Sequence, residues 1–266
     1  MSPRRRLLVA ALALAVALAA VAALAAGLGR PAGPEPLAPG ETPVLVVPGY
    51  NGTAASVGTL AARLRADGRR VVVVELPDRG TGDLRRSATA LAAAVDRTGA
   101  ARVDLVGFSA GGLVVRLLLE DPVRALRARR VVLLGTPNHG TELAGAVAAL
   151  DPSLCTTSIC QLAPGSALLA ELNRGDETPP GPEFFSIWTA LDQTVTPPAT
   201  ATLEGAANIR VQDVCASARL GHGGLVVDPL ALGLVTEALA GTLPDPPGSG
   251  DCAALRAAGA SGARIR

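Results

Sequence analysis

The pentapeptide Gly107-Phe108-Ser109-Ala110-Gly111 is the part of the chain whose residue types and spacing point most directly to chemistry. It follows the apolar run 103–106 and precedes a second apolar run that begins at Gly112. A G-x-S-x-G sequence between a strand and a helix is typical of a nucleophile elbow, in which a sharp turn pushes the serine hydroxyl outward. The helix N-terminus favours negative charge. We therefore predict that Ser109 is a catalytic nucleophile.

A serine nucleophile needs a base, because its hydroxyl is a poor nucleophile at neutral pH. The chain has two histidines, His139 and His222. His222 lies between glycines in the loop 220–225, just after the last predicted strand, so it is free to reach the elbow. We predict that His222 is the base and that His139 is a structural residue or part of the pocket wall.

The base in turn needs a carboxylate that orients it. Asp192 follows the predicted strand 185–189 and precedes His222 in the chain, so we predict that it is this acid. Asp213 and Asp228 are the alternatives. Asp213 lies beside Cys215, and Asp228 is placed where it would cap the last helix.

An oxyanion hole for the developing charge takes one N–H from the residue after the nucleophile, here Ala110. The second N–H comes from the loop 48–53, which follows the first strand. Tyr50 is the predicted donor and Asn51 is the alternative that the sequence does not separate from it.

An ester with an acyl chain needs an apolar cleft beside the nucleophile. The segment 141–165 has the length of a small flap over such a cleft. The residues that we predict to contact substrate are Asn51, Phe108, Leu143 and Val195, with Tyr50, Val147 and Thr194 as further candidates for the cleft wall.

The elements that must position these residues alternate between short apolar runs and segments of helical period. The predicted strands are residues 44–47, 71–74, 103–106, 131–135, 185–189 and 208–211. Continuous β-branched runs of this kind predict an α/β fold, with a mostly parallel sheet of about six strands and helices on both faces. Ligands then bind at the carboxyl ends of the strands, which is where each candidate residue falls.

The chain divides into four predicted parts. Residues 1–25 have the basic start, apolar run and small residues of a secretory signal peptide, with cleavage before Ala26. Residues 26–43 are a linker rich in Pro and Gly, residues 44–243 are the catalytic domain, and residues 244–266 are a loosely ordered tail. The sequence therefore predicts secretion, and an uncleaved membrane anchor is the alternative.

Four cysteines, all after the predicted signal peptide, predict two disulfides. Three pairings are possible. We favour Cys155–Cys160, which would close a short loop, together with Cys215–Cys252, which would tie the tail to the loop before His222. The spacing does not resemble a zinc site, so we predict no metal.

The charge composition excludes several classes of function. The formal net charge is +1, so the chain lacks the excess of positive charge that is typical of proteins that bind nucleic acid. All 24 basic residues are arginine, so a lysine Schiff base and a Ser-Lys dyad are both excluded.

The chain from Val44 to about Leu239 resembles the small secreted bacterial lipases of the α/β-hydrolase family, often called class 2 lipases. The most specific matches are Gly135-Thr136-Pro137-Asn138-His139-Gly140-Thr141 and Ala163-Pro164-Gly165-Ser166. The resemblance implies a minimal α/β-hydrolase fold and the triad Ser109, Asp192 and His222. Pro48-Gly49-Tyr50 departs from the His-Gly pair of many members, which changes nearby hydrogen bonds but not the backbone donors.

These observations predict a secreted serine hydrolase of short- to medium-chain acyl esters, with triacylglycerols among its substrates. It needs no cofactor, works as a monomer and contacts lipid interfaces transiently. An acyltransferase and a polyester depolymerase are alternatives that use the same triad. A non-catalytic binding module is the alternative from a different class, because one fold hosts many functions.

Overall fold

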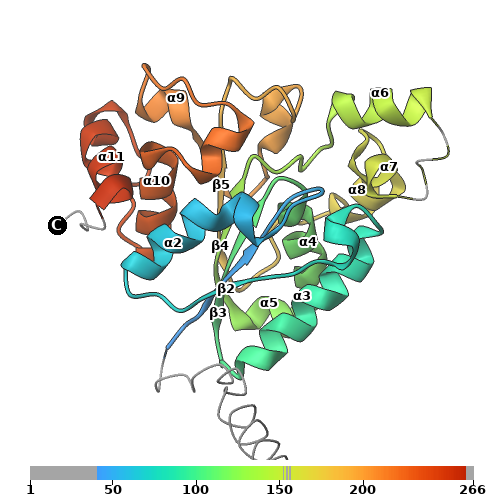
Figure 1. Ribbon diagram of the computed structural model, residues 1–266, viewed down its shortest axis with the longest axis horizontal. Helices are drawn as coiled ribbons and strands as arrows, with labels where there is room; N and C mark the ends of the chain where they lie inside the picture. Colours follow the sequence, from blue (N-terminus) through green and yellow to red (C-terminus); the bar gives the residue numbers. More distant parts are fainter. Residues whose placement is uncertain (1–40, 152, 154, 156, 262–266) are drawn as a thin grey trace, which may run out of the picture. The chain divides into compact units, whose positions relative to one another are not determined.

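The fold is built on a single parallel sheet with the strand order β2-β1-β3-β4-β5-β6 (Figure 1). The computed structural model describes residues 41–151, 153, 155 and 157–261, so the predicted signal peptide and most of the predicted linker lie outside it. The strands are β1 (Val44–Val47), β2 (Val71–Val73), β3 (Val103–Phe108), β4 (Ala128–Leu134), β5 (Glu183–Trp188) and β6 (Ala207–Arg210). The six strands confirm the sheet that the apolar runs predict.

The central strands are buried on both faces, which explains their unbroken apolar sequences. All four residues of β1 and the last four of β4 are fully buried. In the register of the sheet, Phe108 pairs with Leu134, and Leu134 pairs with Ile187. The carboxyl ends of β3, β4 and β5 therefore lie side by side, and the loops that follow them meet at one edge.

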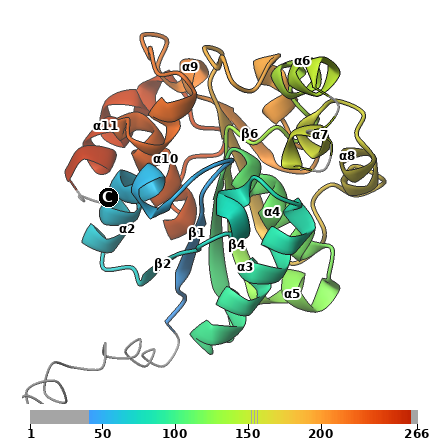
Figure 2. The same cartoon turned by 45° about the vertical axis from the view of Figure 1, so that its right-hand side comes forward.

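Helices cover both faces of the sheet (Figures 1 and 2). One layer contains α3 (Leu84–Thr98), α4 (Ala110–Leu119) and α5 (Pro122–Arg127), and the other contains α2 (Gly58–Ala66), α10 (Pro229–Ala240) and α11 (Cys252–Ser261). As predicted, Asp228 caps α10, where its carboxylate accepts the N–H of Leu230 at 2.8 Å. In the described part of the chain, no helix is long and apolar enough to cross a membrane.

Four short helices lie near the carboxyl edge of the sheet, where the predicted site residues fall. They are α6 (Glu142–Leu150), α7 (Ser158–Leu162), α8 (Ala167–Leu172) and α9 (Val211–Val214). The first three follow β4, and α6 and α7 lie in the segment 141–165, where the sequence predicts a flap (Figure 1). The fourth follows β6 directly.

The C-terminal segment differs from the predicted loosely ordered tail. Residues 252–261 form α11, in which Leu255 and Ala258 are almost fully buried. The reason is a close approach of backbones: a Cβ on Gly233 of α10 would lie 1.9 Å from the carbonyl oxygen of Leu255. The guanidinium of Arg63 on α2 also donates to the carbonyl of Ala258, at 2.5 Å from Nη2. The close backbone contact at Gly233 and this hydrogen bond fix the helix, and a hydropathy pattern records neither of them.

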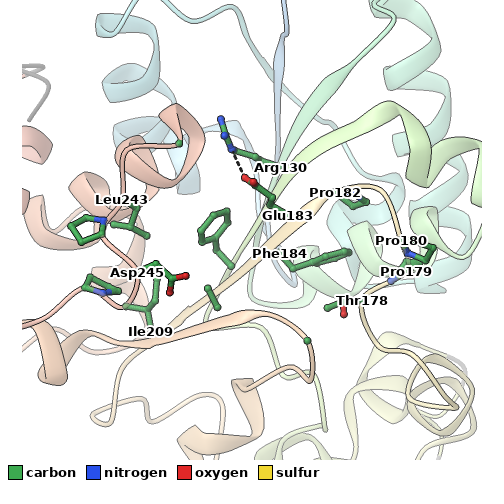
Figure 3. A pocket seen from close by; sticks show the side chains of 16 residues that line it. Arg130, Thr178, Pro179, Pro180, Pro182, Glu183, Phe184, Ile209, Leu243 and Asp245 are labelled. Carbon is green, nitrogen blue, oxygen red and sulfur yellow. Dashed lines mark hydrogen bonds and ion pairs between the residues drawn. The ribbon is translucent and has the colours of Figure 1, made fainter.

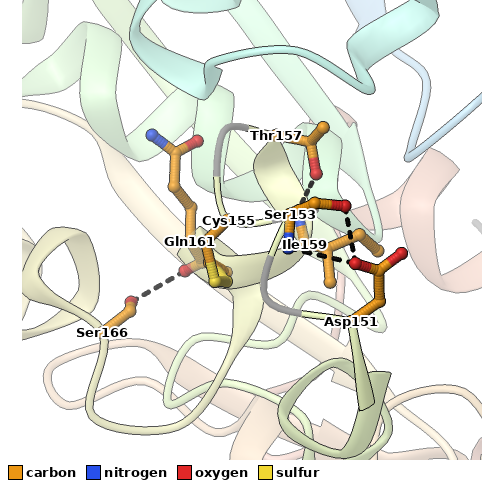
Figure 4. The surroundings of a disulfide bond; sticks show 8 residues. Asp151, Ser153, Cys155, Thr157, Ile159, Gln161 and Ser166 are labelled. Atoms are coloured by element: carbon orange, nitrogen blue, oxygen red, sulfur yellow. Dashed lines mark hydrogen bonds between the residues drawn. A yellow bond between two sulfur atoms is a disulfide. The ribbon is translucent and has the colours of Figure 1, made fainter. Parts of the chain in front are cut away.

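Both disulfides have the predicted pairing. Cys155–Cys160 joins the loop between α6 and α7 to α7 itself, with 4.8 Å between the Cα atoms (Figure 4). Cys215–Cys252 joins the end of α9 to the start of α11, with 5.2 Å between the Cα atoms. The second disulfide therefore attaches α11 to the segment that leads to His222.

The contact between α10 and α11 predicts a strong asymmetry between two glycine substitutions. Gly233→Ala should destabilise the fold by about 1–3 kcal/mol or more, because its Cβ would overlap a backbone carbonyl that cannot rotate away. Gly58→Ala should be neutral or stabilising by about 0.5 kcal/mol, because its Cβ meets nothing within 4 Å and its φ is −61°. Urea unfolding of both variants checks this, and equal stabilities would contradict it.

Candidate active site

Ser109 lies at the reversal between β3 and α4 in a backbone conformation that few residues adopt. Its φ is 55° and its ψ is −130°, and a positive φ of this kind costs a non-glycine residue about 1–3 kcal/mol. Its N–H donates to the carbonyl of Leu134 at 2.8 Å, which ties the turn to the end of β4. Strand, turn and helix follow one another as the pentapeptide predicts.

Two glycines make this turn sterically possible. A Cβ on Gly107 would lie 2.5 Å from the Cα of Gly112. A Cβ on Gly111 would lie 2.4 Å from the carbonyl oxygens of both Val47 and Pro48. Both contacts are to backbone that has no room to move, so the glycines of G-x-S-x-G are a packing requirement here.

His222 and Asp192 form a hydrogen-bonded pair. The ring Nδ1 lies 2.7 Å from Asp192 Oδ2, and the side chains are 14% and 2% exposed, respectively. Because an ionised carboxylate only accepts, Nδ1 carries the proton and donates it. This tautomer leaves Nε2 as the acceptor, which is the state that a general base needs.

The other oxygen of Asp192 is held by the backbone. Oδ1 accepts the N–H groups of Thr194 and Val195, each at 2.8 Å. A buried carboxylate is costly unless its lone pairs are satisfied, and these donors supply that. They also fix the orientation of the oxygen that faces His222.

The pair and the serine turn converge on the ends of β3 and β4. The ring of Phe108, the neighbour of Ser109, lies against the His222 ring with 4.9 Å between centroids. Gly135 follows β4 with a φ of 52°, and a Cβ there would lie 3.2 Å from His222 Nδ1 and 3.3 Å from Asp192 Oδ2. Gly135 lies in the G-T-P-N-H-G-T motif but has no predicted role of its own.

The loop after β1 lies directly against Ser109. A Cβ on Gly49 would lie 2.8 Å from the Cβ of Ser109 and 3.4 Å from its Oγ. The loop turns back through a hydrogen bond from Gly52 N–H to the Gly49 carbonyl at 3.0 Å, with Asn51 at a φ of 52°. Tyr50 and Asn51, the two candidate oxyanion donors, lie within this turn. Ala110 begins α4, where backbone N–H groups have no partner inside the helix.

The alternative site residues have partners elsewhere. His139 Nε2 lies 3.0 Å from Glu177 Oε1, and its Nδ1 lies 3.3 Å from the carbonyl oxygen of Thr200. Asp213 pairs with Arg210. The hydrogen bond from Asp213 raises the pKa of the Arg210 guanidinium. None of these pairs includes Ser109, Asp192 or His222.

The predicted substrate-contact residues fall into two groups. Asn51 and Leu143 are exposed, and Phe108 is half-buried beside His222. Val195 is only 1% exposed, and its N–H holds Asp192. The structure therefore places Val195 against Asp192 and not on an open surface.

Thr141 is a site residue that the sequence analysis missed. Its Oγ1 donates to the Thr194 carbonyl at 2.7 Å and accepts the Thr196 N–H at 3.0 Å. It thereby fixes the loop after Asp192 to the start of α6. No local pattern signals this contact, because it joins residues more than 50 positions apart in the chain.

Two cavities, of about 440 and 450 Å³, lie away from these residues. They share Phe184 and the pair Pro179-Pro180, and the Arg130–Glu183 ion pair lines the first of them (Figure 3). Both lie near the amino ends of β4 and β5, and neither is lined by Ser109, Asp192 or His222. Within the described ranges there is no cluster of three or more His, Cys, Asp or Glu residues that could hold a metal.

The chain is similar in structure to two lipases. Lipase B of Aspergillus fumigatus matches with a TM-score of 0.66 and 22% identity, over 84% of this chain and 57% of that one. Lipase BlEst2 of Bacillus licheniformis in its propeptide form matches with a TM-score of 0.57 and 20% identity, over 72% of this chain and 48% of that one. This chain thus spans about half the length of each.

The mature form of BlEst2 matches over 89% of its length, with a TM-score of 0.55 and 19% identity. An alpha/beta hydrolase from the metagenome of Mar Chica lagoon sediments matches with a TM-score of 0.50 and 19% identity, over 70% of this chain and 84% of that one. These similarities show that the chain has the α/β-hydrolase fold, as its motifs predict.

The sequence comparisons are less informative. A domain of unknown function, DUF7379, matches residues 81–151, which include α3, the serine turn and α4. No curated protein sequence matches the chain.

Proposed function

We propose that this protein hydrolyses carboxylic esters, with Ser109 as nucleophile, His222 as base and Asp192 as the orienting acid. The observation that carries the proposal is the partly buried Asp192–His222 hydrogen bond of 2.7 Å, formed near the turn that holds Ser109 at a positive φ. The fold is that of known lipases and esterases, which supports ester hydrolysis in general.

The reaction proceeds by double displacement. Ser109 Oγ attacks the ester carbonyl carbon while His222 Nε2 takes the hydroxyl proton and passes it to the departing alcohol. Asp192 accepts from Nδ1–H and stabilises the charged ring. Water then gives a proton to His222, attacks the acyl carbon and releases the acid, and the proton returns to Ser109.

The oxyanion of each tetrahedral intermediate needs donors already in place. The N–H of Ala110 supplies one, at the positive end of α4. The second comes from the turn 49–52, with Tyr50 as the proposed donor and Asn51 as the alternative. The close contact between Gly49 and Ser109 supports this role, because it brings the turn to the nucleophile.

The substrate class is proposed from an apolar rim, which we define as Tyr50, Leu143, Leu150 and Leu191. They are 43%, 49%, 87% and 44% exposed, and they lie on segments that follow β1, β4 and β5. α6 contributes two of them, and Ala144 is its one buried residue. An exposed apolar helix attached to the loop that follows Asp192 suits acyl chains and transient contact with a lipid surface. We therefore propose short- to medium-chain acyl esters as substrates, including triacylglycerols.

The site of action is proposed to be outside the cytoplasm. Two disulfides fit an oxidising compartment, and residues 1–25 have the pattern of an export signal. Cleavage before Ala26 would release a monomeric enzyme, and retention of the segment would tether it to the membrane.

Turnover of nitrophenyl esters from C2 to C16 tests the reaction. We expect hydrolysis with a maximum between about C4 and C8, and a loss of several orders of magnitude in kcat for Ser109→Ala with the fold intact. Circular dichroism of both proteins serves as the control. The absence of turnover on every ester would contradict the proposal, and acyl transfer to an added alcohol or clearing of a polyester emulsion would redirect it.

Three aspartate variants test the acid. Asp192→Asn should lower kcat by about 10⁴-fold, because the amide favours the wrong tautomer of His222. Asp213→Asn and Asp228→Asn are matched controls and should keep kcat within about threefold, since surface changes away from the chemistry have small effects. A normal rate for Asp192→Asn would move the acid role to another residue.

Leu150→Glu tests contact with lipid. The charge should weaken binding to anionic or zwitterionic vesicles and slow hydrolysis of emulsified triacylglycerol, because it disfavours insertion of α6. Hydrolysis of a dissolved C4 ester should not change. Val123→Glu on α5, 69% exposed, is the matched control. Equal effects of the two substitutions on vesicle binding would refute a role for the apolar rim.

A further inference from the structure

We propose that Thr189 and Gln212 are positioning residues that hold the loop of the acid and the loop of the base at a fixed separation. This inference rests on the proposed function. Thr189 directly follows β5, is fully buried, and donates its hydroxyl to the carbonyl of Leu220 at 2.8 Å. Leu220 lies two residues before His222, so the bond connects the acid loop to the base loop.

The same hydroxyl accepts two further hydrogen bonds. Gln212 Nε2 donates to it at 2.9 Å, and the N–H of Leu191 donates to it at 3.2 Å. The Thr189 carbonyl also accepts the N–H of Asp192 at 3.2 Å. One donor and two acceptor sites are the full capacity of a hydroxyl group, so Thr189 Oγ1 is saturated.

Gln212 completes the connection from the other side. Its Oε1 accepts the N–H of Ala190 at 2.9 Å, while its Nε2 reaches Thr189. The amide therefore uses its acceptor and its donor on adjacent residues of the acid loop. No other side chain of the same length offers both groups in this arrangement.

The short helix α9, which carries Gln212, is firmly anchored. Gln212 lies on α9, between Val211 and Val214, which are both fully buried. Cys215, the next residue after α9, is joined to Cys252 at the start of α11. The acid loop is thus braced against a segment that is anchored by the core and by a disulfide.

The loops also approach each other beyond Thr189. A Cβ on Gly221 would lie 3.4 Å from the carbonyl oxygen of Leu191. The 2.7 Å bond between Asp192 and His222 crosses between these two loops, so its length depends on their separation. A displacement of catalytic groups by about 1 Å can lower the rate by roughly 100-fold. Contacts that fix the separation of these two loops are therefore expected to affect the rate.

Thr189→Val is the direct test, since it removes the hydroxyl at nearly constant volume. We expect the rate at which a nitrophenyl phosphonate labels Ser109 to fall by about 10- to 100-fold, and kcat on a C4 ester to fall equally with KM within about threefold. Thr189→Ser restores the hydroxyl and should recover most of the rate. Thr236→Val is the matched control, because that buried hydroxyl has no hydrogen-bond partner among the described residues.

Gln212→Met provides a second variant that keeps the Thr189–Leu220 bond, in case Thr189→Val does not fold. Gln212→Met should also lower the labelling rate, by a smaller factor than Thr189→Val does. The low-field proton resonance of His222 Nδ1–H should broaden or shift in Thr189→Val and Gln212→Met and remain in Thr236→Val.

The readouts separate this inference from the proposed function. If the phosphonate labels Ser109 but no ester is hydrolysed, the proposed substrate class is wrong. The labelling rates of the variants still test the positioning role of Thr189 and Gln212. If the wild-type serine were not labelled, the His222 resonance would still decide. Unchanged labelling and an unchanged resonance in folded Thr189→Val would overturn the inference.

Discussion

The backbone reversal at Ser109 is the constraint on which the rest of the site depends. A strand can turn into a helix within one residue only if the neighbouring segments leave room, so glycine occupies positions 107 and 111 and closely packed backbone surrounds them. The cost of the positive φ is offset by the sheet, because the Ser109 N–H is bound by the carbonyl at the end of β4. Ser109 is therefore placed by the most buried part of the fold, and the loops around it are arranged about a fixed point.

Asp192 and His222 are positioned by a different principle. Asp192 lies on a loop and His222 begins the short 3-10 helix His222–Val226, and hydrogen bonds, not a strand, set the geometry of both segments. Backbone N–H groups hold one oxygen of Asp192, and Thr141 holds the loop that supplies those groups. A buried carboxylate with one unsatisfied oxygen would be unfavourable, so the same bonds that orient Asp192 also make its burial tolerable. Stability and geometry are here maintained by one set of contacts.

The strands, the serine turn and one helix cap could be predicted because each depends on residues that are close together in the sequence. Buried parallel strands give unbroken apolar runs, the elbow needs its glycines within two residues of the serine, and Asp228 caps a helix two residues away. The sequence could not show features that depend on distant contacts. α11 packs through glycine at 233 and 259, where the close approach of backbones replaces a hydrophobic stripe. Val195 is apolar, as a residue of a cleft wall would be. It is buried instead, because Thr141 binds the residues on either side of it.

The exposure of α6 follows from how the segment 141–165 is anchored. At one end Thr141 binds the acid loop, and at the other end Ser158 Oγ donates to the Gly80 carbonyl at 3.0 Å. Gln161 of α7 donates to the Asp83 carboxylate at 2.8 Å, and this bond holds the pKa of Asp83 below its usual value. Polar contacts thus fix both ends, so the intervening helix keeps its place without burying its apolar residues. Burial of its apolar residues in an apolar phase would be favourable, and this is the physical basis of the proposed contact with lipid.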